Sequence, residues 1–127
     1  MAWTLLKLHP MKILVADDTD SVRFALRMAL EYLGHEVVGF ATNGEETIKK
    51  FETTQPELVV MDVRMPVMDG LTCTSLLAKN HQAKVVVVTG GRTTESQARE
   101  AGASGFIEKP FDVFDLDRAI TGALATA

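Results

Sequence analysis

Five short apolar runs alternate along the chain with longer segments in which apolar residues recur every three or four positions. Each run is too short for a stable helix and is uninterrupted enough for a strand that is buried on both faces. The longer segments have the spacing of helices that bury one face. The predicted strands are residues 12–16, 36–40, 58–62, 84–88 and 105–108.

Capping residues separate these segments and predict the helix boundaries. The first helix is predicted over residues 20–33, with Gly34 after it as a left-handed C-cap. Asp69 is expected to cap a helix that reaches about residue 80. The other predicted helices begin at Thr42 or Asn43 and end near residue 53, begin at Thr93 or Thr94 and end at Gly102, and begin at about residue 112.

Strand and helix alternate five times, and most connections between strands are too long for hairpins. This alternation predicts an α/β fold, a (βα)5 doubly wound parallel five-stranded sheet with helices on both faces. All strand ends of one polarity then share an edge. At the carboxyl edge, where open α/β sheets hold their ligands, the prediction gathers Asp17, Asp18, Asp62, Thr89 and Lys109.

The chain has 127 residues, the usual size of one domain, and a net charge of −4 at pH 7. A chain with this net negative charge offers no broad basic surface, so we expect no direct nucleic-acid partner. No apolar run approaches the ~20 residues that span a bilayer, so we expect no membrane partner. The single cysteine, Cys73, fits a reducing cytoplasm and is interpreted as a small helical residue. Residues 1–10 are expected to be a loosely ordered extension, with one domain over residues 11–127.

The expected acidic cluster has a chemical consequence. Three neighbouring carboxylates repel one another, and a divalent cation such as Mg²⁺ removes the conflict, whereas no Cys or His cluster suggests zinc. Lys109 and Thr89 would supply a positive charge and a hydroxyl, which fit a phosphoryl group. Asp62 stands alone on its strand and is the candidate nucleophile, with Asp17 and Asp18 as a metal clamp. The alternative is that these carboxylates are solvated strand ends or pair with Lys109.

The same positions resemble one known family. Asp17-Asp18, Asp62 with Met65-Pro66 and Asp69-Gly70 behind it, Thr89-Gly90 and Lys109-Pro110-Phe111 together resemble the response-regulator receiver domains of two-component signalling. The resemblance covers about residue 11 to the C-terminus. It implies a flavodoxin-like sheet with the strand order 2-1-3-4-5.

The resemblance also implies residue roles. Asp62 would be the phosphoacceptor, assisted by Lys109 and Thr89, and the Lys109–Pro110 peptide bond would be cis. The implied ligands of Mg²⁺ (or Mn²⁺) are Asp17 through water, Asp18, Asp62 and the backbone carbonyl of Arg64.

The implied function is acceptance of a phosphoryl group from phosphohistidine on a sensor histidine kinase or a histidine phosphotransfer protein. Thr89 would move toward the new oxygens, Phe106 would turn into the vacated space, and the surface formed by the fourth predicted helix, the fifth predicted strand and the fifth predicted helix would change for a downstream protein target. Receivers phosphorylate and dephosphorylate only themselves, so we expect a cytoplasmic signalling domain that is not an enzyme. A weak homodimer is compatible with the family.

Two features depart from the usual family pattern. The interval from Thr89 to Lys109 is 20 positions, shorter than usual, which predicts a fourth helix of about two turns and makes relatives' output modes a poor guide. Arg64 and Gly91 occupy positions that influence phosphoryl hydrolysis in the family. We expect Gly91 to leave the attacking water unshielded and Arg64 to cover it in part.

Three other functions share parts of this pattern. A flavodoxin-like flavin module would need a Ser/Thr/Gly-rich loop where Asp17-Asp18 stands. A phosphatase of the haloacid dehalogenase type would need an aspartate where Arg64 stands. A pseudo-receiver that serves only as a docking platform would not need the intact acidic set. Because the chain ends soon after the fifth helix, we expect a stand-alone regulator or the excised receiver domain of a longer protein.

Phe24, Met28 and Tyr32 form a second apolar line on the first helix. We interpret this line as a widening of the buried stripe. The alternative is an exposed strip for a partner helix.

Overall fold

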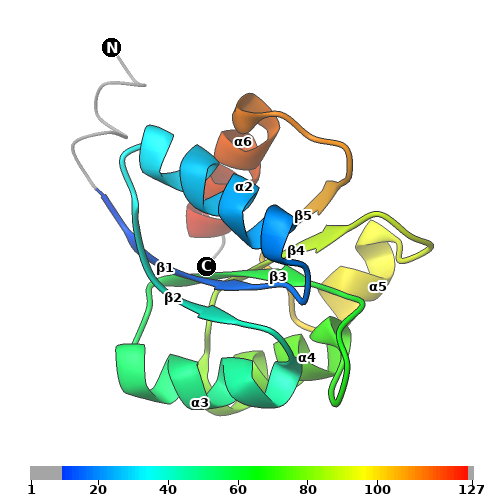
Figure 1. Cartoon of the computed structure of the whole chain (residues 1–127). Coiled ribbons are helices and arrows are strands. Elements are labelled where there is room, and N and C mark those ends of the chain that lie inside the picture. The colour runs from blue at the N-terminus through cyan, green and yellow to red at the C-terminus, as the bar shows by residue number, and fades with distance from the viewer. Residues whose placement is uncertain (1–9, 126–127) are drawn as a thin grey trace.

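The computed structural model describes residues 10–125, which form a five-stranded parallel sheet with helices on both sides (Figure 1). The strand order is β2-β1-β3-β4-β5, so the predicted order is confirmed. The strands are β1 (Lys12–Ala16), β2 (Glu36–Ala41), β3 (Leu58–Asp62), β4 (Val85–Thr89) and β5 (Gly105–Glu108). The helices are α2 (Asp20–Tyr32), α3 (Gly44–Thr54), α4 (Gly70–His81), α5 (Glu95–Glu100) and α6 (Val113–Ala125).

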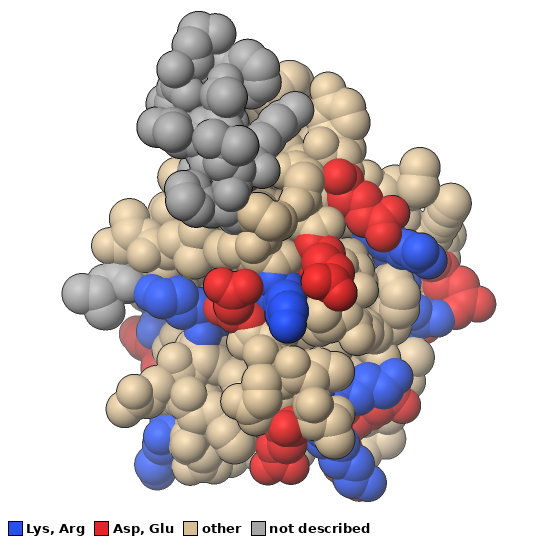
Figure 2. All heavy atoms as spheres, turned by 90° about the vertical axis from the view of Figure 1, so that its left-hand side faces the viewer, with Lys and Arg blue, Asp and Glu red and all other residues tan. Residues whose placement is uncertain are grey.

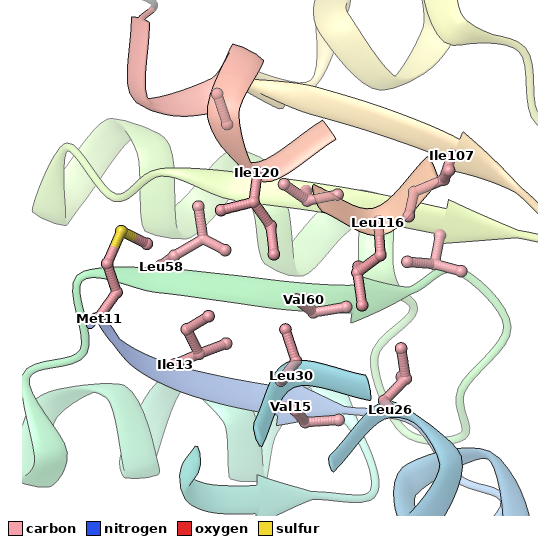
Figure 3. Close-up of a cluster of buried hydrophobic side chains, with 13 residues drawn as sticks. Met11, Ile13, Val15, Leu26, Leu30, Leu58, Val60, Ile107, Leu116 and Ile120 are labelled. Atoms are coloured by element: carbon pink, nitrogen blue, oxygen red, sulfur yellow. The ribbon is translucent and has the colours of Figure 1, made fainter. Parts of the chain in front are cut away.

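The helices divide between the two faces of the sheet. α2 and α6 cover one face, and α3, α4 and α5 cover the other (Figure 1). Both faces of β1, β3 and β4 are therefore buried, which is why these strands are uninterrupted apolar runs in the sequence. Figure 3 shows the core on the α2 and α6 side, where Ile13 and Val60 of the sheet share one buried cluster with Leu30 and Leu116.

Side-chain caps fix where three of the helices begin. The Asn43 side chain accepts a hydrogen bond from the Glu46 N–H at 2.8 Å, and the Asp69 side chain accepts one from the Thr72 N–H at 2.8 Å. Thr94 forms a capping box at the start of α5, which has only six residues, as the short interval in the sequence predicts. The sequence left open whether Thr42 or Asn43 caps α3 and whether Thr93 or Thr94 caps α5. In the structure the caps are Asn43 and Thr94.

The interpretation of the second apolar line on α2 as core is wrong. Phe24, Met28 and Tyr32 are 54%, 57% and 68% exposed. The face of α2 that packs on the sheet is centred on Leu26 and Leu30, which are buried. The three other side chains lie outside the arc of the helix that the sheet reaches, so the exposed strip is the correct alternative.

Among the described residues, no helix is both long and apolar enough to cross a membrane. The extension expected over residues 1–10 lies outside the described residues except for Pro10, which is exposed. At the amino ends of the strands, basic and acidic side chains are interspersed (Figure 2). Cys73 is buried in α4, where burial raises the pKa of its thiol to about 12, so the interpretation as a small helical residue holds.

Two buried threonines differ in their hydrogen bonding and provide a test of the core. Thr47 Oγ1 donates to the backbone oxygen of Asn43 at 2.7 Å, whereas Thr74 Oγ1 has no hydrogen-bond partner. A buried hydroxyl without a partner costs about 1–3 kcal/mol, so Thr74→Val should raise the free energy of unfolding by about 1 kcal/mol. Thr47→Val should lower it by a similar amount. Denaturant unfolding of both variants measures this, and a stabilised Thr47→Val or a destabilised Thr74→Val would contradict it.

Candidate functional site

Four strands end at one rim of the sheet and bring polar groups together there. Asp17 and Asp18 follow β1, Asp62 ends β3, Thr89 ends β4, and Lys109 follows β5. Asp18, Asp62, Thr89 and Lys109 line a pocket of about 270 Å³ at this rim, which is on the right-hand side of Figure 1, and Asp17 lies beside it. The structure therefore brings all five predicted residues together.

Lys109 links the two buried carboxylates. Its Nζ lies 3.5 Å from Asp17 Oδ2 and 3.5 Å from Asp62 Oδ1. Asp18, by contrast, is exposed. Burial raises the pKa of the Asp62 carboxyl, the negative charge of Asp17 raises it further, and Lys109 offsets these effects only in part.

The three carboxylates fit a divalent cation. One oxygen from each of Asp17, Asp18 and Asp62 lies within 4.8 Å of the other two, so a single ion can be reached by all three directly or through water. Carboxylate oxygens are ligands that Mg²⁺ and Mn²⁺ accept readily. A bound cation would also counteract the burial and the Asp17 charge that raise the pKa of the Asp62 carboxyl.

The β4 side of the pocket is lined by a hydroxyl and two glycines. Thr89 is buried, and its Oγ1 accepts a hydrogen bond from the Gly91 N–H at 3.1 Å. A Cβ at Gly91 would lie 3.4–3.6 Å from the Arg64 guanidinium, so the Arg64 side chain lies directly over this glycine. The pocket is therefore covered by the Arg64 side chain over Gly91 and bordered by the Lys109 side chain beside Gly90, where a Cβ would lie 3.5–4.0 Å from the Lys109 carbons.

Comparison with known proteins identifies the domain. A model of the response regulator receiver domain matches residues 13–121. The chain belongs to this family. It is therefore a receiver domain of a two-component system, and the flavodoxin-like fold is that of its relatives.

Two curated relatives and two solved structures show the range of the family. The receiver is 38% identical over 118 residues to the transcriptional regulatory protein PdtaR of Mycobacterium tuberculosis, covering 91% of this chain and 58% of PdtaR. It is 36% identical over 103 residues to the chemotaxis protein CheY of Thermotoga maritima, covering 79% of this chain and 86% of CheY. The chain thus spans little more than half the length of PdtaR.

A crystal structure of a LuxR-family two-component response regulator from Aurantimonas sp. SI85-9A1 matches with a TM-score of 0.85 at 30% identity, covering 92% of this chain and 86% of that one. The CheX-CheY-BeF3-Mg²⁺ complex from Borrelia burgdorferi shows the same fold, with a TM-score of 0.84 at 24% identity over 92% and 91% of the chains.

Arg23 belongs to the receiver site but was not predicted from the sequence. Its guanidinium donates to the backbone oxygen of Asp17 at 2.7 Å and pairs with Asp20, while the Thr19 N–H donates to Asp17 Oδ1 at 2.8 Å. These contacts hold the loop after β1. One feature of the sequence could have indicated this role. Arg23 is a basic residue in the first turn of a predicted helix, where the helix dipole disfavours positive charge.

The loop after Asp62 is fixed by its backbone. A Cβ at Gly70 would overlap the backbone oxygen of Asp62, so only glycine fits there. Val67 has φ +70°, and the Met68 N–H donates to the Pro66 oxygen at 2.7 Å, which together make a γ-turn. A positive φ is strained for a β-branched residue.

Phe106 lies apart from the pocket that contains Asp62. It is half-buried on β5, packs against the core under α3 and α4, and borders a separate cavity of about 710 Å³ between α5 and α6. The Lys109–Pro110 peptide bond that follows β5 is cis.

The charge conflict at Asp62 leads to a stability prediction. Because the folded state raises the pKa of this carboxyl, its ionisation costs stability, and that stability is lost as the pH rises through the folded-state pKa. With EDTA present at pH 7–8, Asp62→Asn should therefore raise the free energy of unfolding by about 1 kcal/mol, or the melting temperature by roughly 3–6 °C.

Thermal unfolding of parent and variant between pH 4 and pH 8 measures this effect. The gap should be small at the acid end of this range and should widen as the pH rises. Glu100→Gln, which removes an exposed carboxylate of the same charge, is the matched control and should show no such widening. An Asp62→Asn variant that is less stable than the parent at pH 8 would contradict the assignment.

Proposed function

We propose that this receiver accepts a phosphoryl group on Asp62 from phosphohistidine on a sensor histidine kinase or a histidine phosphotransfer protein. The observation that carries the proposal is the position of the Lys109 ammonium, 3.5 Å from the carboxylates of both Asp17 and Asp62 at the mouth of the pocket. A carboxylate oxygen of Asp62 would form the new P–O bond as the P–N bond breaks and the imidazole leaves with its electron pair.

The chain's own groups suit the charge that this transfer moves. Lys109 can leave its contact with Asp62 and follow the phosphoryl oxygens, because its ammonium is the cation already facing that carboxylate. The Gly90 and Gly91 backbone leaves room for the phosphoryl group. Buried Asp62 needs no large movement to react, because the loop behind it is held by the close fit of Gly70.

We propose Mg²⁺ (or Mn²⁺) as the cofactor. Asp18, Asp62 and the Arg64 backbone carbonyl would hold it, and it would supply positive charge against the phosphoryl oxygens. Asp17 would contribute through water, since its Oδ1 accepts the Thr19 N–H and its Oδ2 contacts Lys109.

Thr89 and Phe106 are proposed to carry the switch. In this structure the Thr89 hydroxyl accepts a hydrogen bond from its own loop, and a phosphoryl group on Asp62 would offer it a charged acceptor instead. Phe106 would follow into the space that Thr89 leaves. The surface that changes would be that of α5, β5 and α6, beside the cavity that Phe106 borders.

Members of this family interact with kinases and downstream targets. For this receiver we propose a downstream protein as target, in the cytoplasm, with no turnover of an external substrate.

Phosphoryl acceptance is directly measurable. Incubation of the parent with Mg²⁺ and acetyl phosphate should add the mass of one phosphoryl group, and EDTA should abolish the gain. Asp62→Asn should gain nothing, whereas Glu100→Gln should behave as the parent does. An unmodified parent, or an Asp62→Asn variant modified to the same extent, would overturn the proposal.

Arg64 and Gly91 are expected to control loss of the phosphoryl group to water. Since the Arg64 side chain lies over Gly91, Arg64→Gly should open the pocket and speed dephosphorylation, and Gly91→Arg should cover it and slow the reaction, each by roughly three- to tenfold. Phosphoryl lifetimes followed by intact mass after removal of acetyl phosphate measure this. Unchanged lifetimes in both variants would refute it.

A further inference from the structure

Arg23 is a cation placed beside the carboxylates that are proposed to hold a metal cation. It lies in the first turn of α2, where the helix dipole disfavours positive charge, and it contacts the loop that carries Asp17 and Asp18. A positive charge at this place also opposes the binding of a metal ion through repulsion. Two electrostatic costs at one residue indicate that its side chain makes a contact of greater benefit to the site.

The Arg23 guanidinium holds the peptide unit that joins Asp17 to Asp18. Its Nη1 donates to the backbone oxygen of Asp17 at 2.7 Å, a short charge-assisted hydrogen bond, and its Nη2 pairs with Asp20. Because a peptide unit is planar, fixing this oxygen also fixes the direction in which the chain enters Asp18. The Arg23 side chain is only 16% exposed, so it is held in this position by its surroundings.

The other polar groups of Asp17 are anchored by separate contacts. The Asp17 N–H donates to the backbone oxygen of Ala41 on β2 at 3.0 Å. In the carboxylate, Oδ1 accepts the Thr19 N–H at 2.8 Å, and Oδ2 lies 3.5 Å from Lys109 Nζ. The contact with Arg23 completes this set, because it holds the carbonyl.

Asp18 is held less firmly than Asp17. Asp18 is exposed, and its Oδ1 accepts a hydrogen bond from Thr19 Oγ1 at 3.5 Å, which is long and therefore weak. The direction of the Asp18 carboxylate thus depends chiefly on the backbone that precedes it. That backbone is the peptide unit that Arg23 holds.

We propose that Arg23 is a positioning residue for the cation site, which raises the affinity for Mg²⁺ by fixing the Asp17–Asp18 peptide unit although its own charge opposes the ion. This inference rests on the Mg²⁺ cofactor proposed above. The two effects of the side chain have opposite signs. Loss of its charge alone would strengthen Mg²⁺ binding, whereas loss of its contact with Asp17 would weaken it, so the direction of the change identifies the dominant effect.

Calorimetric titration of Mg²⁺ into the full chain measures this balance. Arg23→Met removes both the donor and the charge but keeps a good helix former, and it should weaken Mg²⁺ binding by about tenfold. Arg23→Lys keeps the charge and loses the forked donor that contacts Asp17 and Asp20 together, so its affinity should lie between those of the parent and Arg23→Met.

Phosphorylation by acetyl phosphate provides a second readout. Arg23→Met should need more Mg²⁺ than the parent to reach half of its maximal rate, and saturating Mg²⁺ should restore the rate of the parent, because the substitution leaves Asp62 and the carboxylates in place. A rate that saturating Mg²⁺ does not restore would overturn the proposal.

Arg27→Met is the matched control. Arg27 lies one turn further along α2, carries the same charge, and has its Nε 3.2 Å from Glu31 Oε2 at the surface. This substitution should change the Mg²⁺ affinity by less than about twofold, because solvent and salt screen an exposed charge.

Three outcomes of the titration would overturn the proposal. The first is an Arg23→Met variant that binds Mg²⁺ as tightly as the parent or more tightly, and the second is equal weakening in Arg27→Met. If far-UV circular dichroism shows that Arg23→Met does not fold, Arg23→Lys decides, and an affinity equal to that of the parent is the third. A parent that does not bind Mg²⁺ would overturn the proposed cofactor and this inference with it.

Discussion

The contact of one ammonium with two buried carboxylates is the interaction on which the rest of this site depends. Lys109 reaches Asp17 and Asp62 from a strand at the opposite edge of the sheet from β2, so the contact exists only when β1, β3 and β5 are in register. Burial and the negative charge of Asp17 nevertheless keep the pKa of the Asp62 carboxyl raised, and Lys109 offsets them only in part. A further positive charge beside Asp62 would therefore favour the ionised form of its carboxyl.

Backbone packing makes the two sides of Asp62 differ in rigidity. On the α3 and α4 side, Gly70 fits against the Asp62 carbonyl, and the Gly44 N–H donates to the Met68 oxygen at 3.0 Å, so the γ-turn at Val67 is held from both ends. On the other side, two glycines follow Thr89 and lead to a helix of only six residues. A perturbation at Asp62 will therefore move the β4–α5 loop before it moves the β3–α4 loop.

The sequence alone predicted the fold and the five residues at the rim, because both follow from the order of apolar and polar residues within short segments of the chain. A buried parallel strand is an apolar run, and the first polar residue after it, such as Asp62 or Thr89, must lie at the edge. The exposure of Met28 was not predictable in this way, since helical periodicity gives the direction of a side chain but not the width of the sheet below it. Arg23 and Val67 were missed because their roles depend on where the Asp17 carbonyl and the α3 N-terminus lie in space.

The shortness of α5 bears on how a signal could leave the site. β4 and β5 are tied at their ends, where the Lys109 N–H donates to the Thr89 backbone oxygen at 2.7 Å, so the strands themselves cannot separate without loss of that bond. The Thr89 side chain is held by a different contact, in which its Oγ1 accepts a hydrogen bond from the Gly91 N–H of the loop beyond it. Phe106 borders a cavity that already extends beneath this loop, between α5 and α6. Movement of the loop would therefore alter the depth of that cavity directly, without rotation of a long fourth helix, and a target that reads this receiver would meet mostly loop and β5.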